Sequence, residues 1–503
     1  MSSVRPVTET EVPSVGVASE PQLRGNLSMF HLLFTVLAFN APMAVVVGFI
    51  PLVVGYGNGI GAPMAFVAAG VILALIGAPM AFVAAGVILA LFAAGFTTMA
   101  RHLPNPGGFY AYITAGLGRV VGLGSSFLAL LCYYAITLSC YAYFGLVLKS
   151  LIHDRYHGPA ISWWLWGLAL VAVVGVLGYF KLDVSARILS VVLVCEVVIV
   201  LVYDASVVSK GGASGFSLSS FTPHAALSGS TGIALLFAIL CFGGFEATTI
   251  FRDEVRDPDR TVPRAAYLFI GLVTLLYAGS AWLLIQAYGT DKVVAATAAN
   301  PTQSFMDSAA AYSGRVVVDL ATVLLTTSIF AAALSSHNIT ARYLYNLGAD
   351  GILHKGLSKV HPRQGAPYRA SLVTTVTTVL GLAPFVIFAA DPTLLYATLS
   401  GVFGYALIVL LLVTGVAIPV YLRRTRPSDT NVWKSVVAPV LALTGLAVSL
   451  VLATQNFSTL ISGSKSLTNG MFALVYGTFV VGVITALVYR RSRPDVYERI
   501  GRQ

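Results

Sequence analysis

The sequence predicts an all-α, polytopic membrane protein. Of its 503 residues, 57% are hydrophobic and 10% are charged, and the mean hydropathy is +0.84. Soluble domains carry about 25% charged residues, so this composition is typical of a chain immersed in lipid. Long apolar runs fill most of the sequence, and in hydrocarbon such runs satisfy their backbone hydrogen bonds by forming helices.

The apolar runs divide into twelve predicted spans, most of them at or above the roughly 20 residues that a transmembrane helix needs. Three tryptophans, Trp163, Trp164 and Trp166, stand at one end of the fourth run, as in an interfacial aromatic belt. The spans are expected at residues 29–54, 60–99, 119–148, 160–180, 185–208, 230–251, 265–288, 316–345, 370–390, 393–422, 435–454 and 471–489.

The basic residues predict the orientation of these spans. An even number of spans puts both termini on one side, and with that side inside the cell, 24 of the 30 Lys and Arg residues lie in inner segments. The positive-inside rule therefore predicts a cell-membrane protein with both termini in the cytoplasm. The formal charge of +10 then requires no nucleic acid. The four cysteines lie in apolar runs without disulfide or metal spacing, so neither a metal nor a cofactor is expected.

The second predicted span contains a duplication. Residues 60–75 read IGAPMAFVAAGVILAL, and residues 76–91 repeat them letter for letter. Perfect identity indicates a recent or engineered duplication rather than a repeat architecture. As one helix, residues 59–99 would extend roughly 60 Å, twice the hydrocarbon thickness. Because Pro79 can open a new helix, we expect the second copy to take the membrane position and the first to be displaced outward.

Two spans are interrupted near their middle. In the first span, Pro42 lacks a backbone donor and clashes with the preceding turn, so the helix must kink or unwind there. In the sixth span, Gly243 and Gly244 weaken the helix. Spans one and six are equivalent if the chain consists of two five-helix halves, and paired broken helices indicate the substrate site of inverted-repeat transporters. The alternative is that Pro and Gly are simply frequent in membrane helices.

Two acidic residues in the apolar runs are candidate proton-coupling groups. Glu196 lies within ILSVVLVCEVVIVLVY, and Glu246 lies two residues after Gly244. A carboxylate at the bilayer centre costs on the order of 3 kcal/mol on insertion scales, which favours a group that takes up and releases a proton. The alternative for each residue is a neutral carboxylic acid that hydrogen-bonds to a neighbouring helix.

Polar side chains in spans three and eight allow similar alternatives. Tyr134, which follows Tyr133, is a candidate wall of a substrate site, although aromatic pairs in a membrane core commonly serve packing. Ser328 can face a cavity or bond to backbone carbonyls of its own helix. For His337, we expect a hydrogen bond between helices.

Four segments together resemble the amino acid–polyamine–organocation superfamily of secondary transporters. Residues 242–265, FGGFEATTIFRDEVRDPDRTVPRA, resemble the signature of its sixth helix. Residues 104–119, PNPGGFYAYITAGLGR, resemble the inner loop that leads into helix three, and residues 341–370 resemble the loop after helix eight. Residues 41–51, APMAVVVGFIP, stand where the superfamily breaks its first helix.

The resemblance implies the leucine-transporter fold, in which two inverted five-helix repeats precede two further helices. The repeats would be residues 29–209, which include the duplication, and 230–422, joined by an extracellular loop at 210–229. The last two helices would lie within 423–490, and residues 1–28 and 491–503 would be cytoplasmic tails.

The resemblance also implies which residues bind substrate. The backbone of the two broken helices would hold the carboxylate and amine of an amino acid, and Glu196 falls where some proton-coupled members carry a lysine that bridges helices one, five and eight. The substrate-binding positions would be Ala41, Pro42, Met43, Ala44, Val45 and Val46 in the first span and Cys241, Phe242, Gly243, Gly244 and Phe245 in the sixth.

The resulting hypothesis is a proton-coupled importer of amino acids that works by alternating access in the lipid bilayer. The alternatives are an amino acid or amine exchanger, a polyamine permease and, on the same fold, a sensor that does not transport. No nucleotide-binding loop and no nucleophile paired with a base occurs in the sequence, so no enzyme activity is expected.

Overall fold

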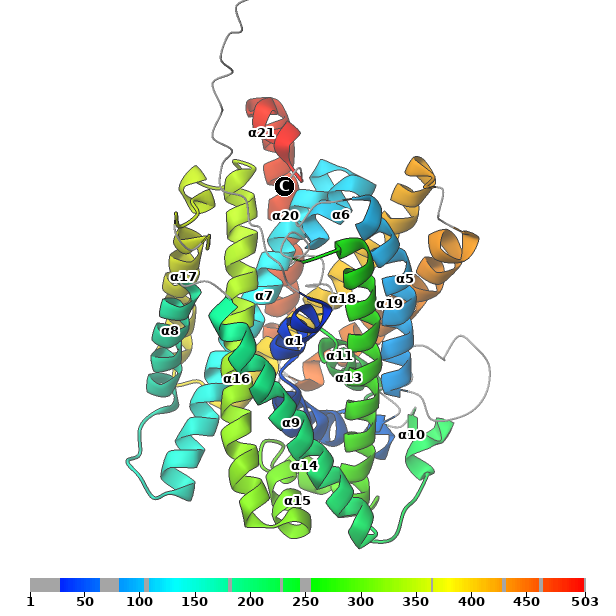
Figure 1. The fold of residues 1–503 in the computed structure, drawn as a ribbon, viewed down its shortest axis with the longest axis vertical. Coiled ribbons are helices and arrows are strands. Elements are labelled where there is room, and N and C mark those ends of the chain that lie inside the picture. The colour runs from blue at the N-terminus through cyan, green and yellow to red at the C-terminus, as the bar shows by residue number, and fades with distance from the viewer. Residues whose placement is uncertain are drawn as a thin grey trace, which may run out of the picture.

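A computed structural model describes residues 28–63, 81–103, 108–179, 183–226, 229–244, 255–362, 365–427, 431–460 and 465–501. Within these ranges the regular structure is helical, and most long helices run along the long axis of the molecule (Figure 1). Nine of the described helices are long and apolar enough to cross a membrane. Three shorter apolar helices, Ile88–Ala100, Trp163–Tyr179 and Thr231–Leu240, coincide with the second, fourth and sixth predicted spans.

These observations support a multi-spanning, all-helical membrane protein, while the count of twelve spans and the inverted repeat stay predictions. The helices of the first half are α1 (Met29–Asn40), α2 (Pro42–Ala44), α3 (Ile50–Leu52), α5 (Ala81–His102), α6 (Gly108–Leu117), α7 (Arg119–Lys149), α8 (Trp163–Tyr179) and α9 (Asp183–Lys210). Single π or 3₁₀ turns join or extend them: η1 (Val45–Phe49), η2 (Val53–Asn58), η3 (Gly59–Gly61) and η4 (Ser150–Arg155).

The second half continues the helical bundle. Its helices are α10 (Pro223–Ala226), α11 (Thr231–Leu240), α13 (Pro258–Tyr288), α14 (Val293–Ala299), α15 (Ser304–Ser313), α16 (Arg315–Ala349), α17 (Tyr368–Ile387), α18 (Pro392–Thr425), α19 (Ala438–Leu460), α20 (Lys465–Ser492) and α21 (Pro494–Arg499). The short turns are η5 (Ser219–Phe221), η7 (Lys355–Ser358) and η8 (Trp433–Val437).

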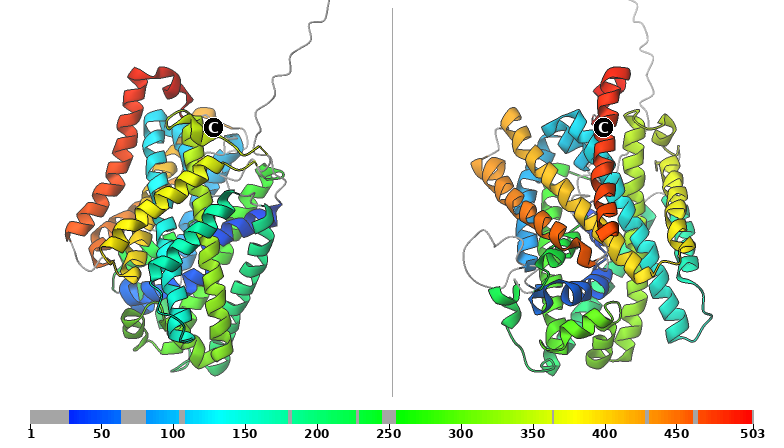
Figure 2. Two further views of the ribbon diagram at one scale, coloured as in Figure 1. Left: turned by 90° about the vertical axis from the view of Figure 1, so that its left-hand side faces the viewer. Right: turned by 180° about the vertical axis from the view of Figure 1, so that it is seen from behind.

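The broken first span occupies the middle of this bundle. Helix α1 contacts α9, α13 and α16, whereas α11 contacts α18, α19 and the turn η2 (Figure 1). The most apolar part of Leu32–Gly61 is completely buried, as expected for a helix that is hydrophobic on all sides. By contrast, α20 lies along the edge of the bundle (Figure 2), and only 17% of its most apolar window is buried.

Helix α7 is the main packing partner of the interior, since it contacts α6, α8, α16, α18 and α20. The short helix α6 occupies most of residues 104–119, the segment that resembles an inner loop. It packs between α7 and α18, and its residues Gly108–Ile113 are buried because they face those two helices rather than water.

The duplicated segment is divided between two parts of the fold. Residues 81–91 of the second copy form the first half of α5, which contacts α13, α18 and α19. With 22 residues, α5 is about 33 Å long, which is enough for one membrane crossing. Of the first copy, only residues 60–63 lie in the described part of the chain, where Gly61 closes the turn η3.

Candidate substrate site

The first helix breaks at the position that Pro42 predicts. Helix α1 ends at Asn40, and Ala41 adopts a left-handed conformation with φ 51° and ψ 71° before Pro42 starts α2. The right-handed α conformation is disfavoured for a residue that precedes proline, and Ala41 does not adopt it. The break exposes backbone groups that the helix would otherwise pair internally.

The sixth span is interrupted in the same way at its glycine pair. Helix α11 ends at Leu240, and a turn over residues 241–244 follows, in which Gly244 has φ +111°. A Cβ atom on Gly244 would lie 2.5 Å from Cδ1 of Phe39. Glycine is therefore required both by the backbone conformation and by the close approach of α1.

Asn40 joins the two breaks. Its side-chain amide donates to the carbonyl of Cys241 and, at 3.3 Å, to the carbonyl of Gly243, and its carbonyl accepts from the hydroxyl of Tyr277 on α13. With 7% of its surface exposed, Asn40 makes these contacts away from bulk water, where an unpaired carbonyl would be costly. Sequence analysis did not single out Asn40, although it lies two residues before Pro42.

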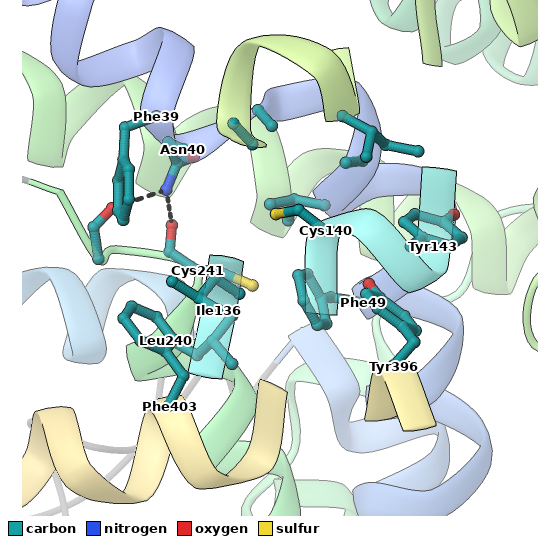
Figure 3. Close-up of a pocket in the computed structure, with 16 residues that line it drawn as sticks. Phe39, Asn40, Phe49, Ile136, Cys140, Tyr143, Leu240, Cys241, Tyr396 and Phe403 are labelled. Carbon is teal, nitrogen blue, oxygen red and sulfur yellow. Dashed lines mark hydrogen bonds between the residues drawn. The ribbon is translucent and has the colours of Figure 1, made fainter. Parts of the chain in front are cut away.

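A pocket lies between the two breaks (Figure 3). Its free volume of about 40 Å³ has room for a water molecule, so an amino acid must enlarge it to enter. One side is formed by the stacked rings of Tyr143 and Tyr396, whose centroids are 4.2 Å apart. The described lining residues are Phe39, Asn40, Ala41, Ala44, Val45, Phe49, Ile136, Cys140, Tyr143, Leu240, Cys241, Gly243, Ile329, Ala332, Tyr396 and Phe403, and none of them carries a charge.

The pocket contains part of the predicted substrate site. Ala41, Ala44, Val45, Cys241 and Gly243 line it. Pro42, Met43, Val46, Phe242 and Gly244 belong to the same broken segments without being among the lining residues, and Phe245 and Glu246 lie outside the described residues.

Tyr134 is not among the residues that line this pocket. Its hydroxyl donates to the carbonyl of Thr377, so the side chain faces α17. Tyr143, nine positions further along α7, lies in the pocket together with Tyr396 of α18. Both tyrosines lie on α7, and the side chain of Tyr134 is directed at α17 rather than at the pocket.

Glu196 connects three predicted spans. It lies on α9 with 2% of its surface exposed, and its Oε2 atom accepts from the hydroxyl of Ser328 at 2.6 Å and from the backbone N–H of Met43 at 3.3 Å. Ser328 belongs to α16, and Met43 lies just after the break in the first span. The carboxyl group therefore contacts helices five, eight and one, the three that the superfamily resemblance implied.

Two other polar contacts bear on the sequence predictions. His337 shares a hydrogen bond of 2.9 Å with Ser371, which links α16 to α17 and confirms the expected bond between helices. Asp204, a second buried acid on α9, accepts from the hydroxyl of Ser280 at 2.9 Å. Sequence analysis passed over Asp204 because it lies close to the predicted end of its span.

Comparisons with known proteins show the family to which the chain belongs. The family model described as amino acid permease matches residues 51–493. A low-affinity putrescine importer, PlaP of Escherichia coli K12, is 25% identical over 285 residues, which cover 55% of this chain and 60% of the importer. The branched-chain amino acid permease BcaP of Bacillus subtilis 168 is 23% identical over 307 residues, covering 58% of this chain and 63% of the permease.

A third relative, the aromatic amino acid transport protein AroP of Escherichia coli O6:H1, is 24% identical over 234 residues, or 44% of this chain and 49% of that protein. The chain therefore matches about half to three fifths of the length of these relatives.

A bundle of apolar helices with two broken helices around a buried pocket belongs to the class of membrane transporters. Within that class, the chain belongs to the amino acid permease family of the amino acid–polyamine–organocation superfamily.

Proposed function

We propose that this permease imports neutral, apolar amino acids together with protons, by alternating access across the cell membrane and with both termini in the cytoplasm. The observation that carries the proposal is the position of Glu196, whose carboxyl group contacts three spans and one of the two helix breaks. The apolar pocket beside those breaks supports the choice of substrate.

The contacts of Glu196 support proton coupling. A neutral acid is tolerated in a buried site, whereas a carboxylate there needs donors, which Ser328 and the Met43 N–H supply. Proton loss strengthens both contacts and draws α16 and the segment after Ala41 toward α9. Because that segment forms part of the pocket wall, protonation and substrate binding act on the same structure.

Substrate selectivity follows from the chemistry of the pocket wall. A zwitterionic amino acid can place its carboxylate against N–H groups and its ammonium against C=O groups of broken helices. Aliphatic and aromatic residues such as Ile136, Ile329 and Phe403 offer an apolar surface for its side chain. A diamine such as putrescine would bring two cationic groups, and no described lining residue is acidic. The wall therefore favours a neutral amino acid over a polyamine.

The experiment is uptake of radiolabelled leucine, phenylalanine, lysine, glutamate and putrescine into proteoliposomes, with and without an inward proton gradient. We expect gradient-driven uptake of leucine or phenylalanine. In Glu196→Gln, uptake should lose its dependence on the gradient because glutamine cannot release a proton. The matched control is Asp204→Asn, which neutralises another buried acid of α9 that bonds to α13 rather than to the first span.

Each other outcome identifies an alternative. Gradient-driven uptake that persists in Glu196→Gln contradicts the coupling assignment. Uptake only into vesicles preloaded with amino acid indicates an exchanger, and uptake of putrescine alone indicates a polyamine permease. Binding without uptake under any condition indicates a sensor.

A further inference from the structure

A second cavity lies near the end of the bundle opposite α21. Its volume is about 240 Å³, enough for an amino acid, and its walls come from the end of α7, the turn η4, the segment before α15 and the first turns of α16. Helix α7 begins beside α21, where the guanidinium of Arg119 lies over the ring of Tyr497, and reaches the cavity with its other end. Its 31 residues extend about 45 Å, so the cavity lies on the opposite face of the molecule.

The same two helices line both the second cavity and the central pocket. On α7, Tyr143 lines the central pocket and Val147 lines the second cavity. On α16, Ile329 lines the central pocket and Leu325 lines the second cavity. Each pair is four residues apart, or about 6 Å along a helix. The second cavity thus lies about one helical turn from the pocket along α7 and α16, on the outer side in the proposed orientation.

The charged side chains of the second cavity are complementary to the head group of an amino acid. The guanidinium of Arg155 forms a fork with Asp319, with Nη2 at 2.8 Å from Oδ1 and 3.1 Å from Oδ2 and with Nε at 3.1 Å from Oδ1. The two side chains are 44% and 40% exposed, so a solute can reach them. Asp154 adds another carboxylate, and Leu151 and Met306 supply apolar surface.

A cation and carboxylates beside an apolar wall match a zwitterion that carries an apolar side chain. The substrate carboxylate would bond to Arg155, its ammonium to Asp154 or Asp319, and its side chain would pack on the wall. The central pocket differs, because no described residue that lines it is charged. The two sites would therefore recognise the head group by different means, side-chain charges in one and broken helices in the other.

We propose that this cavity is an outer binding site for a neutral amino acid, occupied before the substrate reaches the central pocket. The inference rests on the proposed function, because it takes the same substrate class and the same orientation. An ion pair that only fastens η4 to α16 would hold no ligand, and a lipid tail or head group that fills the cavity would exclude one.

The test is the stoichiometry of tritiated leucine bound to the purified full-length permease in lipid nanodiscs, measured by equilibrium dialysis. We expect two leucine molecules per protein. Val318→Trp fills the second cavity and leaves its charges in place, and Arg155→Gln removes the cation, so each variant should bind one. The matched control is Val316→Trp, because Val316 is exposed on the same helix and does not line the cavity.

A central-site variant separates the two proposals. Ala332→Trp obstructs the central pocket and should leave one leucine, bound at the outer site. A single leucine that is lost in Ala332→Trp but retained in Val318→Trp and Arg155→Gln overturns the outer site and leaves the proposed function intact. Absence of leucine binding and of uptake in the unmodified protein overturns both.

Discussion

Asn40 and Gly244 occupy opposite sides of the contact that holds the two helix breaks together. Asn40 supplies donors to carbonyls of the turn after α11, and Gly244 leaves the space that Phe39 occupies. Asn40 supplies hydrogen bonds that the turn after α11 needs, and Gly244 provides the space that α1 needs for Phe39. The breaks therefore form one unit, and disturbing one side should alter the other.

Gly244→Ala tests this dependence. The added methyl group meets Phe39 and an unfavourable backbone conformation, so we expect a loss of about 1–3 kcal/mol in stability together with weaker leucine binding. Thermal unfolding in detergent and equilibrium binding are the measurements. Gly271→Ala on α13 is the control, because among the described residues no atom beyond the backbone of its own helix lies within 4 Å of its Cβ position. Equal stability of the two variants would contradict the role assigned to Gly244.

The sequence predicts this site in part. Pro42 and the glycine pair act on their own helices, and both interruptions occur where they were expected. The role of Asn40 depends on a carbonyl 201 positions away, and the role of Tyr143 depends on which face α7 turns to the pocket. The residues next to Asn40 or Tyr143 in the sequence do not indicate either contact.

At the scale of elements, the duplicated segment is the clearest departure from a simple span. The turn η3 uses residues of the first copy, and α5 uses residues of the second. Because the copies are identical, removal of residues 60–75 puts Ile76, Gly77, Ala78 and Pro79 directly after Gly59, and restores the local sequence at η3.

We expect the chain without residues 60–75 to take up leucine at least as fast as the full chain and to unfold at a higher temperature. The reason is that the 22 residues of α5 already suffice for one membrane crossing, and the shortened chain keeps all of them. Uptake by both chains in parallel proteoliposomes is the measurement. Loss of uptake on deletion would mean that the first copy is part of the working fold.

At the scale of the whole molecule, three distant segments meet at Asp350, which follows α16. Its Oδ2 atom accepts from the hydroxyl of Tyr110 on α6 and, at 3.1 Å, from the backbone N–H of Gly501. Close by, Val496 and Ile500 are buried, and the hydroxyl of Tyr489 donates to the carbonyl of Ile352 at 3.2 Å. The segment around Gly501 is thus hydrogen-bonded to α6 and to the residues that follow α16.

This junction should respond to pH. Burial raises the pKa of Asp350 above its ordinary value of 3.8, and the hydrogen bonds from Tyr110 and Gly501 oppose that shift without cancelling it. A raised pKa in the folded state means that the contribution of Asp350 to stability is complete below 3.8 and is lost as the pH rises through the raised value. The unfolding temperature of the protein should therefore fall over this range.

Asp350→Asn should remove that pH dependence, because asparagine stays neutral. Thermal unfolding in detergent from about pH 4 upward is the measurement. Asp291→Asn is the control, since Asp291 is exposed and accepts a hydrogen bond from the hydroxyl of the neighbouring Thr290 rather than from a distant segment. An unchanged pH profile in Asp350→Asn would show that the buried carboxyl group does not govern the junction.

The sequence by itself determined the helical membrane class, the approximate positions of the long apolar helices that the structure describes and the positions of the two breaks. Hydropathy, proline and paired glycines act on the segment that contains them, so their effects can be predicted without knowing the neighbours. Only the tertiary structure decided that Glu196 meets Met43 and Ser328, that Tyr134 faces α17, and that α7 and α16 line two cavities in succession. These relations join residues more than 100 positions apart, and packing of the helices, rather than local chemistry, selects which side chains meet.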